Sequence, residues 1–203
     1  MNDSAIPADQ RWSARDTEDA ALLARIAAGD RAAFESLYRA YFARLGRFLQ
    51  RMLRRPPLIE EVINDTLYLV WRRATTYRPP ARASTWIFGI AYRRGLKALA
   101  DLDDPIEGDG ADVADEQPSA EQRLLQAETR RVLDLALAQM SVEQRAVVEL
   151  CYFHACPYRE IAQIMGCPVD TVKTRMFYAR RRLHDLLDAH RKDLPWADAS
   201  SNS

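Results

Sequence analysis

Residues 158–183 contain the most diagnostic pattern in the chain. They read Tyr158-Arg-Glu-Ile-Ala-Gln-Ile-Met-Gly-Cys-Pro-Val-Asp-Thr-Val-Lys-Thr-Arg-Met-Phe-Tyr-Ala-Arg-Arg-Arg-Leu183. Apolar side chains recur at steps of three and four on both sides of a Gly-Cys-Pro turn, which predicts two short helices joined tightly, a helix-turn-helix. The expected inward positions are Ile161, Ala162, Met165, Val169, Val172, Met176, Ala179 and Leu183.

The second of these helices is basic at its remaining positions. Between residues 170 and 182, five basic side chains stand against one acidic side chain. Such a helix suits the major groove of duplex DNA, where its first turns read base edges and its later arginines neutralise phosphates. A solvated basic face is the alternative interpretation. The candidate duplex-DNA contacts are Asp170, Thr171, Lys173, Thr174, Arg175, Tyr178, Arg181 and Arg182.

The charges of the whole chain are balanced but segregated. The 203 residues hold 29 basic and 29 acidic side chains, yet residues 21–100 hold fifteen basic against five acidic ones. Residues 101–121 hold nine acidic side chains and no basic one, and the stretch 101–118 adds two Pro and two Gly. This composition predicts a flexible acidic linker. A further hypothesis is that the linker also covers a neighbouring basic surface until a nucleic acid displaces it.

Outward from these landmarks, the patterning is helical on both sides of the linker. Helices are expected over residues 20–28, over 58–73, and from a cap at Ser84 or Thr85 to residue 99. Between them, one amphipathic helix or a helix pair is expected from an N-cap at Asp30 to about residue 52. Pro79 and Pro80 place 75–83 in a loop. After the linker, helices are expected over 121–140, from a capping box at 141–144, and over the helix-turn-helix to about residue 190.

The sequence therefore predicts an all-α protein of two helical domains. The expected division is an N-terminal tail over 1–19, a first domain over 20–100, an acidic linker over 101–120, a second domain over 121–190, and a C-terminal tail over 191–203.

A second nucleic-acid signal lies in the first domain. Aromatic side chains occur among basic ones in the loop 75–83 and the helix that follows it. This mixture suits single-stranded nucleic acid, because cations bind the backbone and flat rings stack on unpaired bases. The alternative, which we favour for Trp86, is that Trp86 and Phe88 belong to the core. The candidates are Tyr77, Arg78, Arg82, Trp86, Tyr92, Arg93, Arg94 and Lys97.

Several classes of protein are not favoured by the sequence. No apolar run approaches the roughly 18–20 residues of a membrane span, and the acidic N-terminus lacks the apolar core of a signal peptide, so a cytoplasmic protein without membrane insertion is expected. Cys151, His154 and Cys156 could suggest a zinc or thiol site, but without a matched fourth ligand we interpret them as core or turn residues. No catalytic set or phosphate-binding loop is found, so we expect no enzymatic activity, cofactor or metal.

Two sets of motifs together resemble a known family. Phe34-Glu-Ser-Leu-Tyr-Arg-Ala-Tyr41, Glu60-Glu-Val-Ile-Asn-Asp-Thr-Leu-Tyr-Leu-Val-Trp71 and Ser84-Thr-Trp-Ile-Phe-Gly-Ile-Ala-Tyr92 resemble region two of bacterial RNA polymerase sigma factors. Leu137-Ala-Gln-Met-Ser-Val-Glu-Gln-Arg-Ala-Val-Val-Glu149 and the helix-turn-helix resemble region four. The order of the motifs, with no third domain between them, is similar to the extracytoplasmic-function (group four) class.

The resemblance implies a promoter-recognition subunit that binds the β′ and β subunits of the polymerase core and directs transcription initiation. Glu61, Asn64 and Asp65 would bind the clamp helices of β′. The aromatic and basic candidates of residues 77–97 would capture the melted −10 element, and those of 170–182 would read the −35 element in duplex DNA. Many relatives are also held by an anti-sigma factor. Many have an Ile-Ala-Arg-Asn run where this chain has Ile90-Ala-Tyr-Arg-Arg94, so the preferred −10 sequence stays open.

Two alternatives remain at the level of sequence. One is a helix-turn-helix regulator that works without polymerase and whose first domain senses a signal or dimerises. The other is a helical adaptor that binds only protein.

Overall fold

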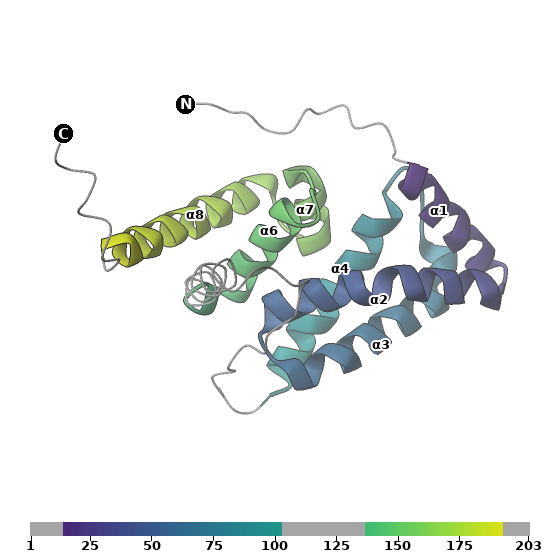
Figure 1. The fold of residues 1–203 in the computed structure, drawn as a ribbon. Helices are drawn as coiled ribbons and strands as arrows, with labels where there is room; N and C mark the ends of the chain where they lie inside the picture. The colour runs from purple at the N-terminus through teal and green to yellow at the C-terminus, as the bar shows by residue number, and fades with distance from the viewer. Residues whose placement is uncertain (1–13, 103–136, 193–203) are drawn as a thin grey trace, which may run out of the picture.

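The computed structural model describes residues 14–102 and 137–192, and every regular element in these ranges is helical. The all-α prediction is therefore confirmed for the described residues. Figure 1 shows two groups of helices. The first contains α1 (Ala14–Ala27), α2 (Arg31–Leu53), α3 (Pro56–Arg73), the short 3-10 turn η1 (Ala74–Thr76) and α4 (Ala83–Ala100). The second contains α6 (Val142–Tyr152), α7 (Tyr158–Met165) and α8 (Val169–Lys192).

Helix α1 begins earlier than the sequence suggested. It starts at Ala14, so the expected tail over residues 1–19 is too long. The added part of the helix is in contact with α2, because Asp19 is only 4% exposed and accepts a hydrogen bond of 2.6 Å from the Tyr41 hydroxyl. This buried pair attaches α1 to α2.

Helix α2 is a single long helix whose N-cap is the predicted one. The Asp30 carboxylate accepts a hydrogen bond from the Ala33 amide at 3.1 Å and also pairs with Arg25 at 2.7 Å. At its other end, Arg54 adopts a left-handed conformation with φ 55°. The next helix begins at once with Pro56, before the predicted start, because proline is well tolerated in the first turn of a helix.

Helix α4 starts at Ala83, and neither Ser84 nor Thr85 caps it, so that prediction is wrong. The Thr85 hydroxyl instead donates to Glu160 of α7 at 3.0 Å. Further along α4, Gly95 lets the helix approach α2 closely. A Cβ at this position would lie 2.7 Å from the Met52 Cε atom and 3.2 Å from Leu53 Cδ2.

The second group of helices follows the sequence closely. The capping box is present, with the Gln144 amide 3.2 Å from Ser141 Oγ and the Ser141 amide 3.0 Å from Gln144 Oε1. The helix-turn-helix turns at Gly166, whose φ of 64° suits glycine. Of the predicted inward positions, six are buried and Val169 and Leu183 are partly buried against the core. The helix expected over 121–140 lies mostly outside the described residues, as does nearly all of the acidic linker.

The two groups of helices pack directly against each other. Helix α6 lies on α2, and α7 lies on α4 (Figure 1). Phe48 and Phe88 of the first group belong to the same hydrophobic cluster as Leu150 and Ile161 of the second. The sequence predicted two domains but gave no sign of this shared core. No described helix is both long enough and apolar enough to span a membrane.

Candidate protein and DNA interfaces

The expected polymerase-binding residues lie on the outer side of α3. Glu61 and Asn64 are exposed, and the Asp65 side chain is 42% exposed. Val62 and Ile63 on the other side of the helix are buried. The amphipathic pattern therefore predicted correctly that this polar face points outward. The pattern does not indicate which protein binds the face.

A surface of aromatic side chains adjoins Asn64, and sequence reasoning missed it. The Tyr38 hydroxyl donates to Asn64 Oδ1 at 3.1 Å, and the Tyr38 ring stacks on Phe42 with centroids 5.5 Å apart. Tyr68, one turn beyond Asn64 on α3, is 59% exposed. We define the aromatic surface as Phe34, Tyr38, Phe42, Tyr68 and Trp71. The signal was available, because three of these rings recur at steps of four along α2.

The expected −10 residues fall into exposed and covered groups. Arg78, Arg93 and Lys97 are exposed, and Trp86 is half-buried. Tyr77, by contrast, is only 8% exposed. Its ring packs against Trp86 at 5.8 Å, and its hydroxyl donates to the Ala81 carbonyl at 2.7 Å. Tyr77 therefore supports the loop and Trp86 from within.

Three other −10 candidates are held by partners inside the chain. Arg82 lies 3.2 Å from Glu160 of α7 and 3.7 Å from Asp16 of α1. Arg94 forms an ion pair with Asp65, which joins the −10 set to the polymerase-binding set.

Tyr92 is the third of these candidates and is only 3% exposed. Burial raises its pKa to about 12, while a hydrogen bond from Arg175 of α8 acts in the opposite direction. Its cover comes from the second group of helices, because Arg175, Cys167 and Glu143 all lie near it. The sequence could not predict this contact between two candidate DNA-binding residues.

The expected −35 face of α8 is largely open. Asp170, Lys173, Thr174, Tyr178 and Arg181 are exposed, while Thr171 and Arg175 are half-buried. Arg182 is exposed and pairs with Gln139. Phe177, which was not a candidate, is 61% exposed beside Tyr178 and packs edge-on against that ring at 5.5 Å.

Charged groups are buried where α6 meets α2. Glu149 is 2% exposed and pairs with Arg51 at 3.1 Å. Arg145 is 8% exposed and donates to the Met52 carbonyl of α2 at 2.9 Å and to the Met140 carbonyl at 2.6 Å. Buried ion pairs contribute less than their Coulomb attraction suggests, because both charges lose water.

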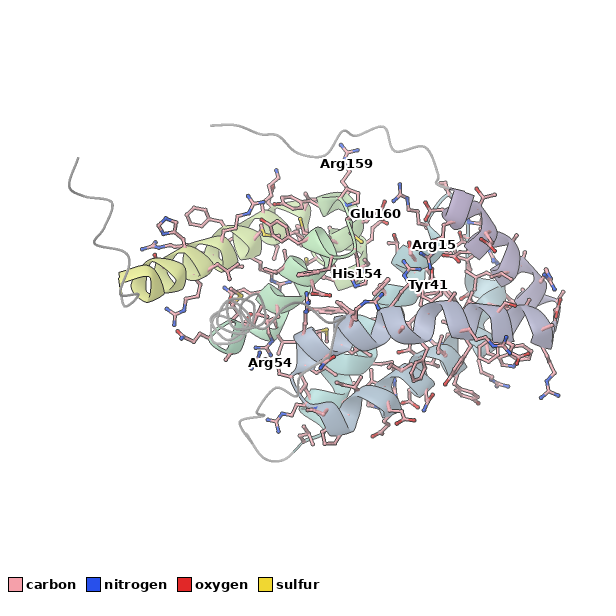
Figure 2. All side chains as sticks on the ribbon, in the orientation of Figure 1. Arg15, Tyr41, Arg54, His154, Arg159 and Glu160 are labelled. Carbon is pink, nitrogen blue, oxygen red and sulfur yellow. The ribbon has the colours of Figure 1, made fainter. Side chains whose placement is uncertain are left out.

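His154 lies between the two groups of helices. Its ring packs against Phe88 at 4.6 Å and Phe48 at 6.2 Å, and Figure 2 shows it between α6 and α2. Burial, with Arg44, Arg47 and Arg51 nearby, lowers its pKa to about 4.

The cysteines near this histidine are free thiols. Cys156 is buried and Cys151 is half-buried. Within residues 14–102 and 137–185, no group of three or more His, Cys, Asp or Glu side chains is placed to hold a metal ion.

Comparison with known proteins agrees with this layout. Residues 37–103 match the model of sigma-70 region 2, and residues 130–183 match the model of sigma-70 region 4. The chain is 32% identical to the extracytoplasmic-function RNA polymerase sigma factor RpoE of Cereibacter sphaeroides, over 76% of this chain and 86% of that protein. It is 33% identical to the sigma factor SigM of Mycobacterium tuberculosis, over 83% of this chain and 84% of that protein.

Two solved structures share the fold at lower sequence identity. One is CnrH in complex with the cytosolic domain of CnrY, with a TM-score of 0.62 and 22% identity, covering 85% of this chain and 98% of that one. The other is the sigma factor RpoE of Bartonella quintana in complex with the anti-sigma factor NepR, with a TM-score of 0.55 and 23% identity, covering 76% of this chain and 96% of that one.

The two groups of helices, with an exposed polar face on α3 and another on α8, define a helical protein of the sigma-70 type. The chain belongs to the extracytoplasmic-function family of RNA polymerase sigma factors. As a member of this family it is a promoter-recognition subunit that directs transcription. Sigma factors are not enzymes.

Proposed function

We propose that the first group of helices binds RNA polymerase core through α3 and the aromatic surface. The observation that carries this assignment is the contact between Tyr38 and Asn64, which joins an exposed polar face to an aromatic surface. In that surface Phe42 and Tyr68 are exposed and the other rings are half-buried. Exposed aromatic side chains beside polar groups are typical of the central part of protein interfaces. Glu61, Asn64 and Asp65 would supply the polar contacts to β′, and the second group of helices would meet β.

The melted −10 element would bind along the loop before α4 and along α4 itself. Arg78, Arg93 and Lys97 are accessible cations for the backbone, and Trp86 offers a partly exposed ring for a base. Arg82, Tyr92 and Arg94 would join them once released from their present partners. Tyr77 would position Trp86 rather than contact DNA.

The −35 element would bind α8 in the major groove. Asp170, Thr171 and Thr174 near the start of the helix would read base edges, and Lys173, Arg181 and Arg182 would neutralise phosphates. Arg175 would be shared between this site and Tyr92. Tyr178 lies on the same exposed side of the helix as Thr174.

A charge reversal on α3 tests core binding. We choose Glu61→Arg because Glu61 is exposed, whereas reversal at Asp65 would place a second guanidinium beside Arg94. We expect binding to purified polymerase core to weaken by about tenfold or more. Glu18→Arg, at an exposed position of α1, is the matched control and should bind normally.

Binding of the Glu61→Arg protein at full strength would contradict the polymerase-binding assignment. If binding to promoter duplex then persisted without polymerase, the result would favour a regulator that works alone.

A subunit of this kind would work in the cytoplasm, without chemistry of its own. We include an anti-sigma protein among its proposed partners. Such a partner would compete with polymerase core for this chain, which a competition assay with the purified proteins would measure.

A further inference from the structure

The end of α6 carries two exposed aromatic rings that belong to none of the candidate interfaces described above. Tyr152 is 56% exposed, and Phe153, which follows it directly, is 54% exposed. Rings that only completed the hydrophobic core would be covered, as Phe48 and Phe88 are. Large aromatic side chains left open side by side are typical of a surface that binds a partner.

An arginine lies against each of these rings. The Arg51 guanidinium of α2 lies 3.7 Å from the centre of the Phe153 ring. Arg180 of α8 donates a hydrogen bond of 3.0 Å to the Tyr152 hydroxyl, and its guanidinium lies 5.9 Å from the centre of that ring. Attraction between cation and ring positions both groups. We define the arginine–aromatic strip as Arg51, Phe153, Tyr152 and Arg180, which runs from α2 across the end of α6 to α8.

The strip and its surroundings are positively charged at the surface. Arg180 is exposed, and the Arg51 side chain is 36% exposed. Arg51 pairs with Glu149, but that carboxylate is only 2% exposed and lies beneath the surface. Arg47, one turn before Arg51, is exposed and, with Arg51, opposes the rise in the pKa of Glu149 that burial causes. A ligand that reaches the strip therefore meets guanidinium groups and rings together.

This combination fits one class of ligand better than others. Single-stranded nucleic acid offers phosphates to guanidinium groups and unpaired bases to rings and guanidinium planes. An acidic peptide would satisfy the arginines but would leave the adjacent rings without flat partners. Duplex DNA also offers phosphates, but its bases are already stacked on one another.

We propose that the arginine–aromatic strip binds single-stranded nucleic acid, with Arg51 and Arg180 on phosphates and Phe153 and Tyr152 on bases. The site is separate from the proposed −10 surface, because none of its residues lies in α4 or in the loop before it. It does not depend on the −10 and −35 assignments. The DNA of an opened promoter and newly made RNA share this chemistry, and the experiment distinguishes them.

Substitution of the rings tests the stacking contacts. Fluorescence anisotropy gives the affinity of the full chain for labelled RNA and DNA strands of one sequence, about 12 nucleotides long. We expect Tyr152→Leu and Phe153→Leu to weaken binding about fivefold or more, because each removes a platform for a base. Tyr152→Phe keeps the ring and should bind more tightly than Tyr152→Leu. Both rings are exposed, so the variants should fold, which circular dichroism checks.

Substitution of an arginine tests the phosphate contacts. Arg180→Ala should weaken binding and reduce the slope of log affinity against log salt by about 0.7, the value for one phosphate of a single strand. The ring substitutions should leave this slope unchanged. Arg39→Ala removes the same charge from a side chain of α2 that is 75% exposed, and it should have little effect on affinity or slope. Polyglutamate serves as a polyanion without bases, and the ring substitutions should not weaken its binding.

Photochemical cross-linking locates the strand on the wild-type chain. Strands that carry a photoreactive thio-base are irradiated in the complex, and the cross-linked peptide is identified by mass spectrometry. We expect cross-links at Tyr152 or Phe153. Tighter binding of the RNA strand would identify the transcript as the natural ligand, and tighter binding of the DNA strand would identify the opened promoter.

Three results would overturn the proposal. One is wild-type affinity in both ring variants. Another is cross-linking confined to residues 75–97, which would remove the strip as a site and leave the −10 assignment intact. The third is an equal loss of affinity for polyglutamate and for nucleic acid in the ring variants, since this would indicate a surface for acidic proteins.

Discussion

At the scale of residues, the pair Tyr41 and Asp19 controls how α1 is attached. Burial raises the pKa of Asp19, and the hydrogen bond from Tyr41 opposes that effect. Arg44 lies 4.5 Å from the centre of the Tyr41 ring and 3.9 Å from the Asp19 carboxylate. The carboxylate thus depends on one hydroxyl donor and on two nearby cations, Arg44 and Arg15.

We expect Tyr41→Phe to lower the free energy of unfolding by about 1–3 kcal/mol, because it leaves a buried carboxylate without its donor. Urea denaturation measures the loss. Tyr38→Phe is the control, since the Tyr38 hydroxyl meets the exposed Asn64, and its loss should stay within about 0.5 kcal/mol. Equal losses would contradict the importance of the buried pair.

Glu149 and His154 give opposite pH dependences at one place in the interface. Their nearest side-chain atoms, Oε1 and Nε2, lie 3.7 Å apart. Burial raises the pKa of Glu149 from 4.5 to about 7, opposed by Arg51 and Arg47. Its contribution to stability is therefore present at acid pH and is lost as pH rises through about 7. The pKa of His154 is lowered from 6.5 to about 4, so its contribution is present above 6.5 and is lost as pH falls toward 4.

In the wild type these two contributions should largely cancel between about pH 4.5 and 6.5. We expect Glu149→Gln to become less stable than wild type as pH falls across this range, since only His154 then titrates. His154→Gln should show the opposite slope and lose stability as pH rises toward 7. Thermal denaturation across the pH series measures both slopes. Parallel curves for the two variants would show that the groups do not titrate as described.

At the scale of elements, the proposed function gives α8 both base-readout and electrostatic contacts to duplex DNA. We expect Arg181→Ala to weaken binding to all duplexes about equally and to reduce the slope of log affinity against log salt by about 0.9. Thr174→Ala should instead change the preferred sequence and leave the slope unaltered. Binding titrations at several salt concentrations measure these effects. Arg39→Ala on α2, whose side chain is 75% exposed, should alter neither property. An unchanged slope in Arg181→Ala would remove Arg181 from the phosphate contacts.

The elements that the sequence predicted well are those fixed by near neighbours. Asp30 caps α2 by accepting a hydrogen bond from the amide three positions further on, and the Ser141 capping box also joins residues three positions apart. Gly166 forms the turn of the helix-turn-helix through its own backbone conformation. Two features that the sequence missed involve distant partners. Asp19, in the unexpected first part of α1, bonds to Tyr41, 22 positions away, and Thr85 bonds to Glu160, 75 positions away. Local chemistry is visible in a sequence, whereas such tertiary contacts require the fold.

The same distinction applies to the candidate interfaces. Helical periodicity placed Glu61 and Asn64 outward, because their surroundings follow from the apolar stripe of their own helix. The mixture of aromatic and basic residues that nominated Tyr77 and Tyr92 could not show that a loop contact buries the first and that the other group of helices covers the second.

At the scale of the whole molecule, Arg145 links the two groups of helices. It donates to the Met52 carbonyl of α2 and to the Leu137 and Met140 carbonyls before α6. One buried guanidinium therefore satisfies backbone groups from both sides of the interface, and together with the shared core it should make the chain unfold as a unit.

We expect calorimetry of the wild type to show a single transition, because the two groups share one core. Arg145→Met should leave carbonyl groups buried without a donor and separate the unfolding into two transitions. Arg159→Met, at an exposed position of α7, is the control and should keep one transition. Two transitions in the wild type would show that the groups are energetically independent.

The ion pair between Asp65 and Arg94 has a consequence for genetics. One residue belongs to the proposed polymerase contact and the other to the proposed −10 contact, so a substitution at either changes the charge environment of both. Mutant screens would therefore score Asp65 as pleiotropic. A substitution there would produce a defect in promoter opening as well as in polymerase binding, and the first would be mistaken for the second. A double mutant that exchanges the two charges would separate these phenotypes. The exchanged residues still attract each other, whereas the polymerase and the DNA each meet a charge of the opposite sign.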